Sequence, residues 1–265
     1  MGTLRRYAKR PLGALKVTDV QRQHLAAIVM PLMQEGKNAT AQMLWEAVSN
    51  VLTWPVKFGH RDDNPLIRLK PDLKKVARDM VLAMEEVATV WRAADALSEM
   101  HRAAIRLLIL LPFRKSESLS CCWTEFDGEW LSIPPERTKN SDATSLFLSS
   151  FAAAQLPVHR NDSDLIFTTD GKLATRSGCK IQTKLREGAG IPQWQFHDFR
   201  RTFSTHMHEA VIERMNDQHF MIEACLNHCD GSRQGVAGVY NRAQYRAQKQ
   251  AMLQAWSDLV EAAVG

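Results

Sequence analysis

A histidine and an arginine stand three residues apart in the segment QFHDFRRTFSTHM, which begins at position 195. The apolar residues of this segment recur at intervals of three and four, so they share one stripe of a predicted helix: Phe196, Phe199, Phe203 and Met207. His197 and Arg200 are neighbours on that helix, and Arg200 lies beside the stripe. We expect a half-buried guanidinium that needs an anionic partner. That partner is either a core carboxylate or a bound ligand.

A second arginine follows the most apolar stretch of the chain. Residues 105–111 are apolar on nearly all sides, so we expect the end of this helix to be buried, and Pro112 to stop it. Arg114 comes next, and Glu117 is again three positions further on, at the start of a short predicted helix. The pair is either a local ion pair that holds a turn, or a carboxylate that orients a guanidinium toward a ligand.

Three further residues could take part in the same chemistry. Lys139 lies at the basic, polar tip of a predicted hairpin, where a lysine alone is typical of a solvated surface. His228 lies near the end of a predicted helix, between Cys225 and Cys229, but these residues lack a second ligand pair at zinc-binding spacing. Tyr240 follows two glycines, and a lone tyrosine is more typical of packing than of catalysis.

The elements that must position these residues are mostly helical. Helices are predicted at about 18–33, from 39 to Pro55 (where a kink or early end is expected), and at about 84–94, 98–111, 149–158, 174–187 and 195–207. A last amphipathic helix follows Tyr240, and could pack within the chain or on a partner. Two short strands, 129–133 and 145–148, form the hairpin. Residues 1 to about 17 are basic and poorly periodic, so we expect them to be frayed.

Composition sets only broad bounds. The chain has 265 residues, 45% of them hydrophobic, with a net charge of +5. This is compatible with nucleic acid binding but also with many other functions. The sequence shows no apolar run of membrane-spanning length and no apolar core of a secretory signal. Five cysteines without disulfide-framework spacing favour reduced thiols and a cytoplasmic location.

Taken together, the order of these residues resembles that of the tyrosine recombinases, the phage integrase family. The shared pattern is Arg114-x-x-Glu117, Lys139 in a hairpin, His197-x-x-Arg200, His228 and Tyr240. The strings HDFRRTFSTHM, IEACLNH, GVAGVYNRAQY and QAWSDLV are similar to those of bacterial phage-type and genomic-island integrases, which belong to mobile genetic elements. The resemblance covers nearly the whole chain.

The resemblance implies a mainly α fold with a small antiparallel β-sheet. Residues 1–66 would form a partial helical, SAM-like core-binding domain and 81–265 the catalytic domain. The polar, charged residues 67–80 between them read as a basic linker, which is either solvated or, if the two domains close on DNA, lies along phosphates. The chain resembles a relative that is truncated at its N-terminus, lacking an arm-binding domain and the first core-binding helix.

The resemblance also implies roles for the residues. Arg114 and Arg200 would hold the scissile phosphate and His228 would donate a further hydrogen bond to it. Tyr240 would attack to give a 3′-phosphotyrosine, Lys139 would protonate the leaving 5′-oxygen and His197 would assist as base. Glu117 would orient Arg114. No cofactor or metal is expected. Tyr245 is the rival nucleophile.

Several positions depart from the family pattern. Leu111-Pro112-Phe113 stands where Thr-Gly-x usually precedes the first arginine, Asn227 replaces a common glycine, and the residues after Lys139 lack the usual basic string. Three functions therefore stay open: site-specific DNA integration and recombination, DNA binding without recombination, and DNA relaxation as by a type IB topoisomerase. The expected partners are double-stranded DNA and DNA-bending accessory proteins, with a free monomer, a tetramer on paired sites and no membrane.

Overall fold

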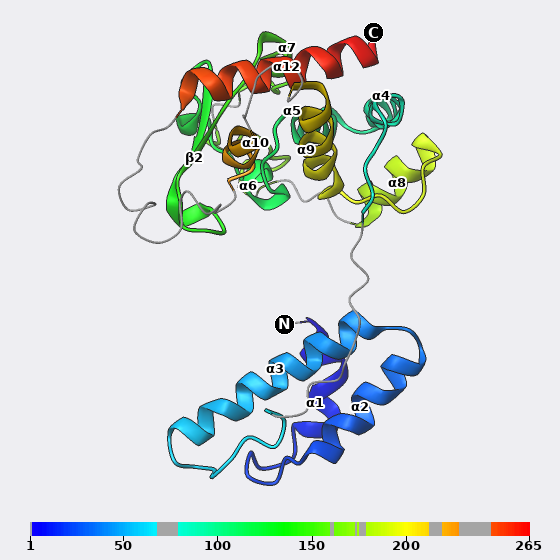
Figure 1. The fold of residues 1–265 in the computed structure, drawn as a ribbon, viewed down its shortest axis with the longest axis vertical. Coiled ribbons are helices and arrows are strands. Elements are labelled where there is room, and N and C mark those ends of the chain that lie inside the picture. Colours follow the sequence, from blue (N-terminus) through cyan, green and yellow to red (C-terminus); the bar gives the residue numbers. More distant parts are fainter. Residues whose placement is uncertain are drawn as a thin grey trace. The chain divides into compact units, whose positions relative to one another are not determined.

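The computed structural model describes residues 2–67, 79–159, 162–172, 174, 179–211, 219–227 and 245–265. The chain divides into two compact units, Met1–Arg78 and Asp79–Gly265 (Figure 1). Each unit has its own hydrophobic core. Most of the predicted linker lies outside the described residues, so the predicted domain limits stay predictions.

The first unit is built from helices alone in its described part. They are a π-helical turn η1 (Leu4–Ala8), α1 (Lys9–Leu12), α2 (Arg22–Gln34) and α3 (Asn38–Lys57). The expectation that residues 1–17 are frayed is wrong for the helical part of this segment. Ala8 is buried, and Leu4, Tyr7 and Leu12 pack against the core of α2 and α3. Burial of these apolar side chains stabilises the segment, although its sequence has only weak helical periodicity.

The two long helices of this unit end in the same way. After α2, Gly36 adopts φ +73°, its N–H donates to the carbonyl of Met33, and the next N–H donates to that of Leu32. After α3, Gly59 adopts φ +70° with the equivalent pair of bonds to Val56 and Pro55. Glycine adopts this left-handed conformation without the clash that a Cβ would cause.

Of the two outcomes expected at Pro55, a kink or an early end of the helix, the early end is wrong, since α3 continues to Lys57. Proline removes one N–H, whose acceptor in a regular helix would be the carbonyl of Val51. Val51 is itself exposed on the surface of α3. The carbonyl of Pro55 is used in turn by His60 at the helix end. We therefore expect proline to destabilise this last turn less than it would destabilise the interior of a helix.

The second unit is mainly helical with one small antiparallel sheet, as predicted. Its helices and strands are α4 (Met84–Ala93), η2 (Ala94–Ala96), α5 (Glu99–Leu110), α6 (Lys115–Leu119), η3 (Trp123–Glu125), β1 (Trp130–Ile133), η4 (Pro135–Arg137), β2 (Thr144–Phe147), α7 (Ser150–Ala153), α8 (Cys179–Ala189), α9 (Asp198–Val211), α10 (His219–Cys225) and α12 (Arg246–Val264).

The predicted hairpin is confirmed. Strands β1 and β2 pair with Trp130 opposite Phe147 and Ile133 opposite Thr144. Two predicted helices differ from the structure. α7 ends at Ala153 instead of continuing to 158, since Pro157 disfavours helix in the residue before it. The helix predicted at about 174–187 is present as α8 from Cys179 to Ala189, but Ala174 forms a bridge with Thr168 and residues 175–178 lie outside the described residues.

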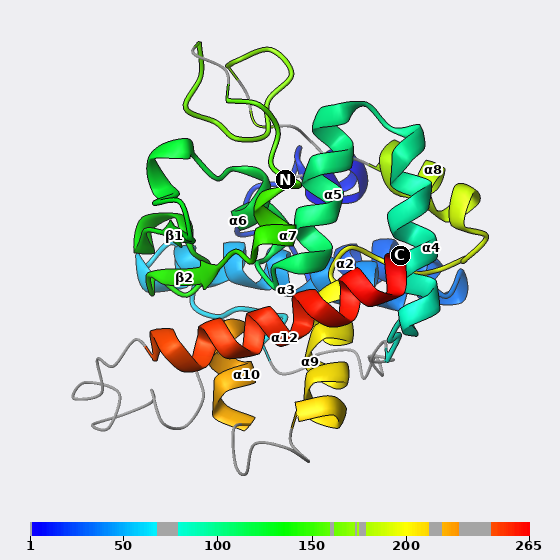
Figure 2. The same ribbon diagram turned by 90° about the horizontal axis from the view of Figure 1, so that it is seen from above.

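The C-terminal helix α12 packs within its own chain. It contacts α4, α5, α7, α9, α10 and β2, and lies across them in the view of Figure 2. Trp256 is buried, donates from its indole nitrogen to the carbonyl of Ile109 at 2.9 Å, and meets the Phe203 ring edge-on. Helix α12 thus contacts α9, which carries Arg200, and the end of α5, which precedes Arg114.

Candidate active site

Arg114 is held by the carboxylate of Glu117. Arg114 precedes α6, and its Nη1 donates to Oε1 of Glu117 at 3.0 Å while its backbone N–H donates to Oε2 at 3.0 Å. The Glu117 side chain is only 2% exposed and that of Arg114 is 17% exposed. The ion pair that the spacing predicts is present. A buried carboxylate that spans the guanidinium and the backbone fixes the direction of Arg114.

The same carboxylate reaches the hairpin tip. The backbone N–H of Lys139 donates to Glu117 Oε1 at 3.2 Å, whereas the side chain of Lys139 is exposed. The next residue, Asn140, accepts from Arg114 Nη2 at 3.3 Å and donates from Nδ2 to the carbonyl of Asn227 at 2.7 Å. The backbone of Lys139 is therefore anchored beside Arg114, and its flexible side chain extends from this fixed point.

Arg200 is buried more deeply than the sequence predicts. Only 4% of the residue is exposed, and it donates from Nη1 to the carbonyl of Pro112 and from Nη2 to that of Leu226 at 2.5 Å. The prediction of half burial is wrong because α9 packs against both α5 and α10. Both of these hydrogen bonds go to backbone carbonyls, which carry partial negative charge.

The charge of Arg200 is costly in this position. Burial lowers the pKa of its guanidinium to about 10, and the positive charge of Arg114 acts in the same direction. The carboxylates of Glu117 and Glu223 oppose this effect. At neutral pH Arg200 is still a cation, and it lies close enough to Arg114 for the two charges to repel one another. A bound anion would relieve that repulsion.

Both guanidiniums converge on one turn of the backbone. Arg200 donates to the carbonyl of Leu226, and Arg114 donates to the carbonyl of the next residue, Asn227, at 3.4 Å. This turn follows the end of α10, where the last carbonyls of a helix favour cations. His228 is the next residue in the chain, so the turn that precedes it is held by both arginines. His228 itself lies outside the described residues.

His197 precedes the first residue of α9 and is exposed. The surrounding protein atoms lower the pKa of its imidazole, as do the charges of Arg200, Arg201 and Arg114, while Asp198 acts in the opposite direction. A lowered pKa favours the neutral ring, which can accept a proton.

Tyr240 lies outside the described residues. The surroundings of the rival nucleophile, Tyr245, are described. Tyr245 adopts φ +49° directly before α12, and its ring packs edge-on against Phe220 with centroids 5.4 Å apart. It also packs against the main hydrophobic core. Tyr245 has the surroundings of a packing residue.

The sequence did not indicate that Asn227 and Asn140 bond to the candidate site residues. Asn227 was noted only as a replacement for glycine, and its φ of +48° explains that replacement, since asparagine tolerates the left-handed conformation. Its Nδ2 donates back to the carbonyl of Asp142 at 3.3 Å. Asn140 gave no sequence signal, because its partner Asn227 is 87 positions away.

Other sites for ligands are less suitable for charged chemistry. Within the described part of the chain, no group of three or more His, Cys, Asp or Glu side chains could hold a metal ion. Burial raises the pKa of the Cys225 thiol to about 12, so it stays protonated.

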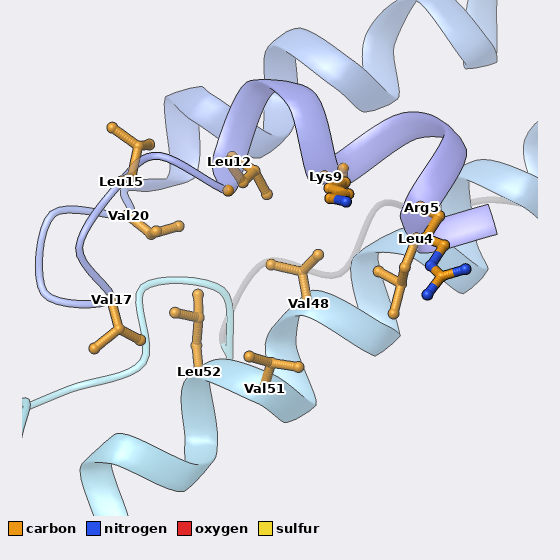
Figure 3. A pocket seen from close by; sticks show the side chains of 12 residues that line it. Leu4, Arg5, Lys9, Leu12, Leu15, Val17, Val20, Val48, Val51 and Leu52 are labelled. Carbon is orange, nitrogen blue, oxygen red and sulfur yellow. The ribbon is translucent and has the colours of Figure 1, made fainter. Parts of the chain in front are cut away.

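The first unit has a pocket of about 380 Å³ between its N-terminal helices and α3 (Figure 3). Its lining is aliphatic apart from Arg5 and Lys9. No described helix could span a membrane.

Comparison with known families matches both units. Residues 1–72 match the phage integrase central domain, and residues 80–259 match the phage integrase family. Among curated proteins, prophage integrase IntA of Escherichia coli K12 is 26% identical over 264 residues, which cover 95% of this chain and 62% of the relative. Prophage integrase IntZ of the same organism is 24% identical, with 94% and 62% covered. The chain thus spans about three fifths of the length of these relatives.

Solved structures show the same fold. A lambda integrase (residues 75–356) dimer bound to a COC′ core site matches with a TM-score of 0.64 and 16% identity, over 91% of this chain and 87% of that one. The Tn1549 transposon integrase in complex with a circular intermediate DNA matches with a TM-score of 0.61 and 11% identity, over 86% and 84%.

Proposed function

Because the chain belongs to the phage integrase family of tyrosine recombinases, we propose that it cuts and rejoins DNA at specific sites through a 3′-phosphotyrosine intermediate. The observation that supports this most strongly is the convergence of Arg114 and Arg200 on the turn Leu226–Asn227. Two repelling cations beside a surface hairpin are suited to an anion with several oxygens, such as a phosphodiester.

The arginines act on the charge that develops during cleavage. Attack on a phosphodiester concentrates negative charge on the non-bridging oxygens of a pentacoordinate phosphorus, so positioned cations lower the barrier. In this proposal Arg114 and Arg200 donate to those oxygens, and His228 donates a further hydrogen bond. Glu117 keeps Arg114 in place without contacting DNA, which its burial supports.

The proton transfers complete the reaction. The hydroxyl oxygen of Tyr240 attacks phosphorus, and the bond from phosphorus to the 5′-oxygen breaks. His197, whose lowered pKa keeps its ring neutral, takes the tyrosine proton, and Lys139 gives a proton to the leaving 5′-oxygen. The new ester conserves the bond energy, so a 5′-hydroxyl of another strand can attack it and rejoin the DNA without ATP.

Double-stranded DNA is the proposed substrate. The net charge of +5 favours contact with a phosphate backbone. Lambda integrase has been solved as a dimer on a core site and as a tetramer on a Holliday junction. By analogy we propose a free monomer that forms a tetramer on paired sites, assisted by DNA-bending proteins, in the cytoplasm.

The proposal is tested by trapping the intermediate. The protein is incubated with nicked suicide duplexes that carry candidate attachment sites, and covalent adducts are resolved on a denaturing gel. We expect an adduct with the wild-type chain and with Tyr245→Phe, and none with Tyr240→Phe.

Each other result favours a different function. DNA binding without an adduct would favour a binding protein that does not recombine DNA. Relaxation of supercoiled plasmid by the monomer would favour a topoisomerase. An adduct that persists in Tyr240→Phe would contradict the assignment of the nucleophile.

A further inference from the structure

The side chain of Asn140 connects three segments that carry candidate residues. Its Nδ2 donates to the carbonyl of Asn227 at 2.7 Å, and its Oδ1 accepts from Arg114 Nη2 at 3.3 Å. Asn227 returns a bond from its own Nδ2 to the carbonyl of Asp142, at 3.3 Å, on the other side of the hairpin tip. The hairpin tip is thus tied twice to the turn that precedes His228.

These bonds restrict the backbone next to Lys139. The N–H of Lys139 is held by Glu117 at 3.2 Å, and the following residue is held by Asn227. Lys139 therefore lies between two anchored points, although its side chain is exposed. A lysine has several rotatable bonds, so its ammonium group can be placed reproducibly only if its backbone is fixed.

We propose that Asn140 is a positioning residue for the general acid: through its bond to the Asn227 carbonyl, it places Lys139 over the leaving 5′-oxygen. This inference rests on the proposed function. Asn140 itself contacts neither the phosphate nor the leaving group. Its amide acts by fixing the distance between the lysine-bearing hairpin and the turn that both arginines hold.

Two variants separate the two hydrogen bonds of Asn140. Asn140→Ala removes both. Asn140→Asp keeps the shape and an oxygen for Arg114, but it loses the donor and places a carboxylate near the Asn227 carbonyl. If the bond to Asn227 matters, both variants are defective. Ser141→Ala, at the exposed neighbouring position, is the matched control.

The experiment measures single-turnover cleavage of nicked suicide DNA at saturating protein. Each variant is compared on an ordinary duplex and on one whose 5′-bridging oxygen is sulfur, because a thiolate leaves without being protonated. We expect Asn140→Ala and Asn140→Asp to cleave the ordinary duplex about 10- to 100-fold more slowly than wild type. On the sulfur duplex the loss should shrink to about threefold or less, as it should for Lys139→Ala.

Two further measurements distinguish this role of Asn140 from a purely structural one. The Kd of Asn140→Ala for DNA should stay within about twofold of wild type, since the amide that it removes does not bind phosphate in this scheme. Amide hydrogen exchange at Lys139 should accelerate in both variants, and this reading requires no cleavage. If Asn140→Ala does not fold, the isosteric Asn140→Asp supplies the same comparison.

Two outcomes would overturn the inference. One is cleavage of the ordinary duplex by both variants at the wild-type rate. The other is an equal loss on both duplexes, which would place the effect on the arginines or on the fold. Failure of the proposed function is distinct, because in that case the wild-type chain itself forms no Tyr240-dependent adduct.

Discussion

Arg200 serves the fold and the proposed chemistry at once. From within the core it donates to the carbonyls of Pro112 and Leu226, which belong to the segments before Arg114 and before His228. Burial lowers its pKa to about 10, yet it keeps its charge at neutral pH. A residue that bonds both segments fixes their separation, and with it the position of the two guanidiniums.

This arrangement predicts that Arg200→Lys lowers stability. A lysine has no planar fork and cannot reach both carbonyls in the same geometry, so one is left without its donor. We expect a loss of about 1–3 kcal/mol in the free energy of unfolding, measured by thermal or denaturant unfolding. Arg201→Lys is the matched control, because its side chain is 36% exposed and pairs locally with Asp198. An equal, small change in both variants would contradict the structural role of Arg200.

The surroundings of His197 predict a pH dependence of cleavage. Its pKa is lowered by the surrounding protein and by Arg200 and Arg201, so the neutral base persists below the ordinary value of 6.5. In a plot of cleavage rate against pH, the fall on the acid side (the acid limb) should therefore have its midpoint below pH 6.5. Arg201→Gln removes one positive charge, which should raise the pKa of His197 and move the limb to higher pH.

The control for this pH shift is Arg102→Gln, since Arg102 lies in α5 and pairs with Asp95. It should leave the acid limb in place. A limb that does not move in Arg201→Gln, or one that moves equally in both variants, would contradict the role of His197 as base.

At the scale of elements, the turn after α10 determines the geometry of the site. Asn227 adopts φ +48°, and its carbonyl receives bonds from Arg114 and Asn140. We expect Asn227→Ala to be about 1 kcal/mol less stable than Asn227→Gly, because a Cβ strains the left-handed conformation. Both variants lose the side-chain bond to Asp142, so their difference in unfolding free energy isolates the backbone. Equal stabilities would show that this turn relaxes without cost.

Local pattern predicted most of these elements. The hairpin, the buried end of α5 before Pro112 and the Arg114–Glu117 pair all depend on residues within a few positions of one another. The exceptions have physical causes. Residues 4–12 are helical because α2 and α3 cover them, and α3 passes Pro55 with the lost bond confined to its last turn.

The contacts within the site could not be predicted in the same way. Arg114 and Asn227 are 113 positions apart, and Arg200 and Pro112 are 88 apart. Neither periodicity nor spacing encodes which carbonyl will accept from a given guanidinium. The order of the candidate residues could be recognised by resemblance, whereas the turn that joins the two arginines required the fold.

At the scale of the whole molecule, two units match two parts of one family. Residues 1–72 match its central domain and residues 80–259 the part that carries the candidate site. Within the second unit, α12 contacts α5, α9 and α10, so one helix supports the segments of both arginines. We propose that this unit carries the cleavage chemistry, with Tyr240 as its nucleophile.

The most direct measurement identifies the residue that becomes attached to DNA. The trapped adduct is digested with a protease and the nucleotide-bearing peptide is sequenced by mass spectrometry. We expect a 3′-phosphate ester on Tyr240, with a free 5′-hydroxyl on the released strand. Attachment at Tyr245, or a link to a 5′-phosphate, would contradict it.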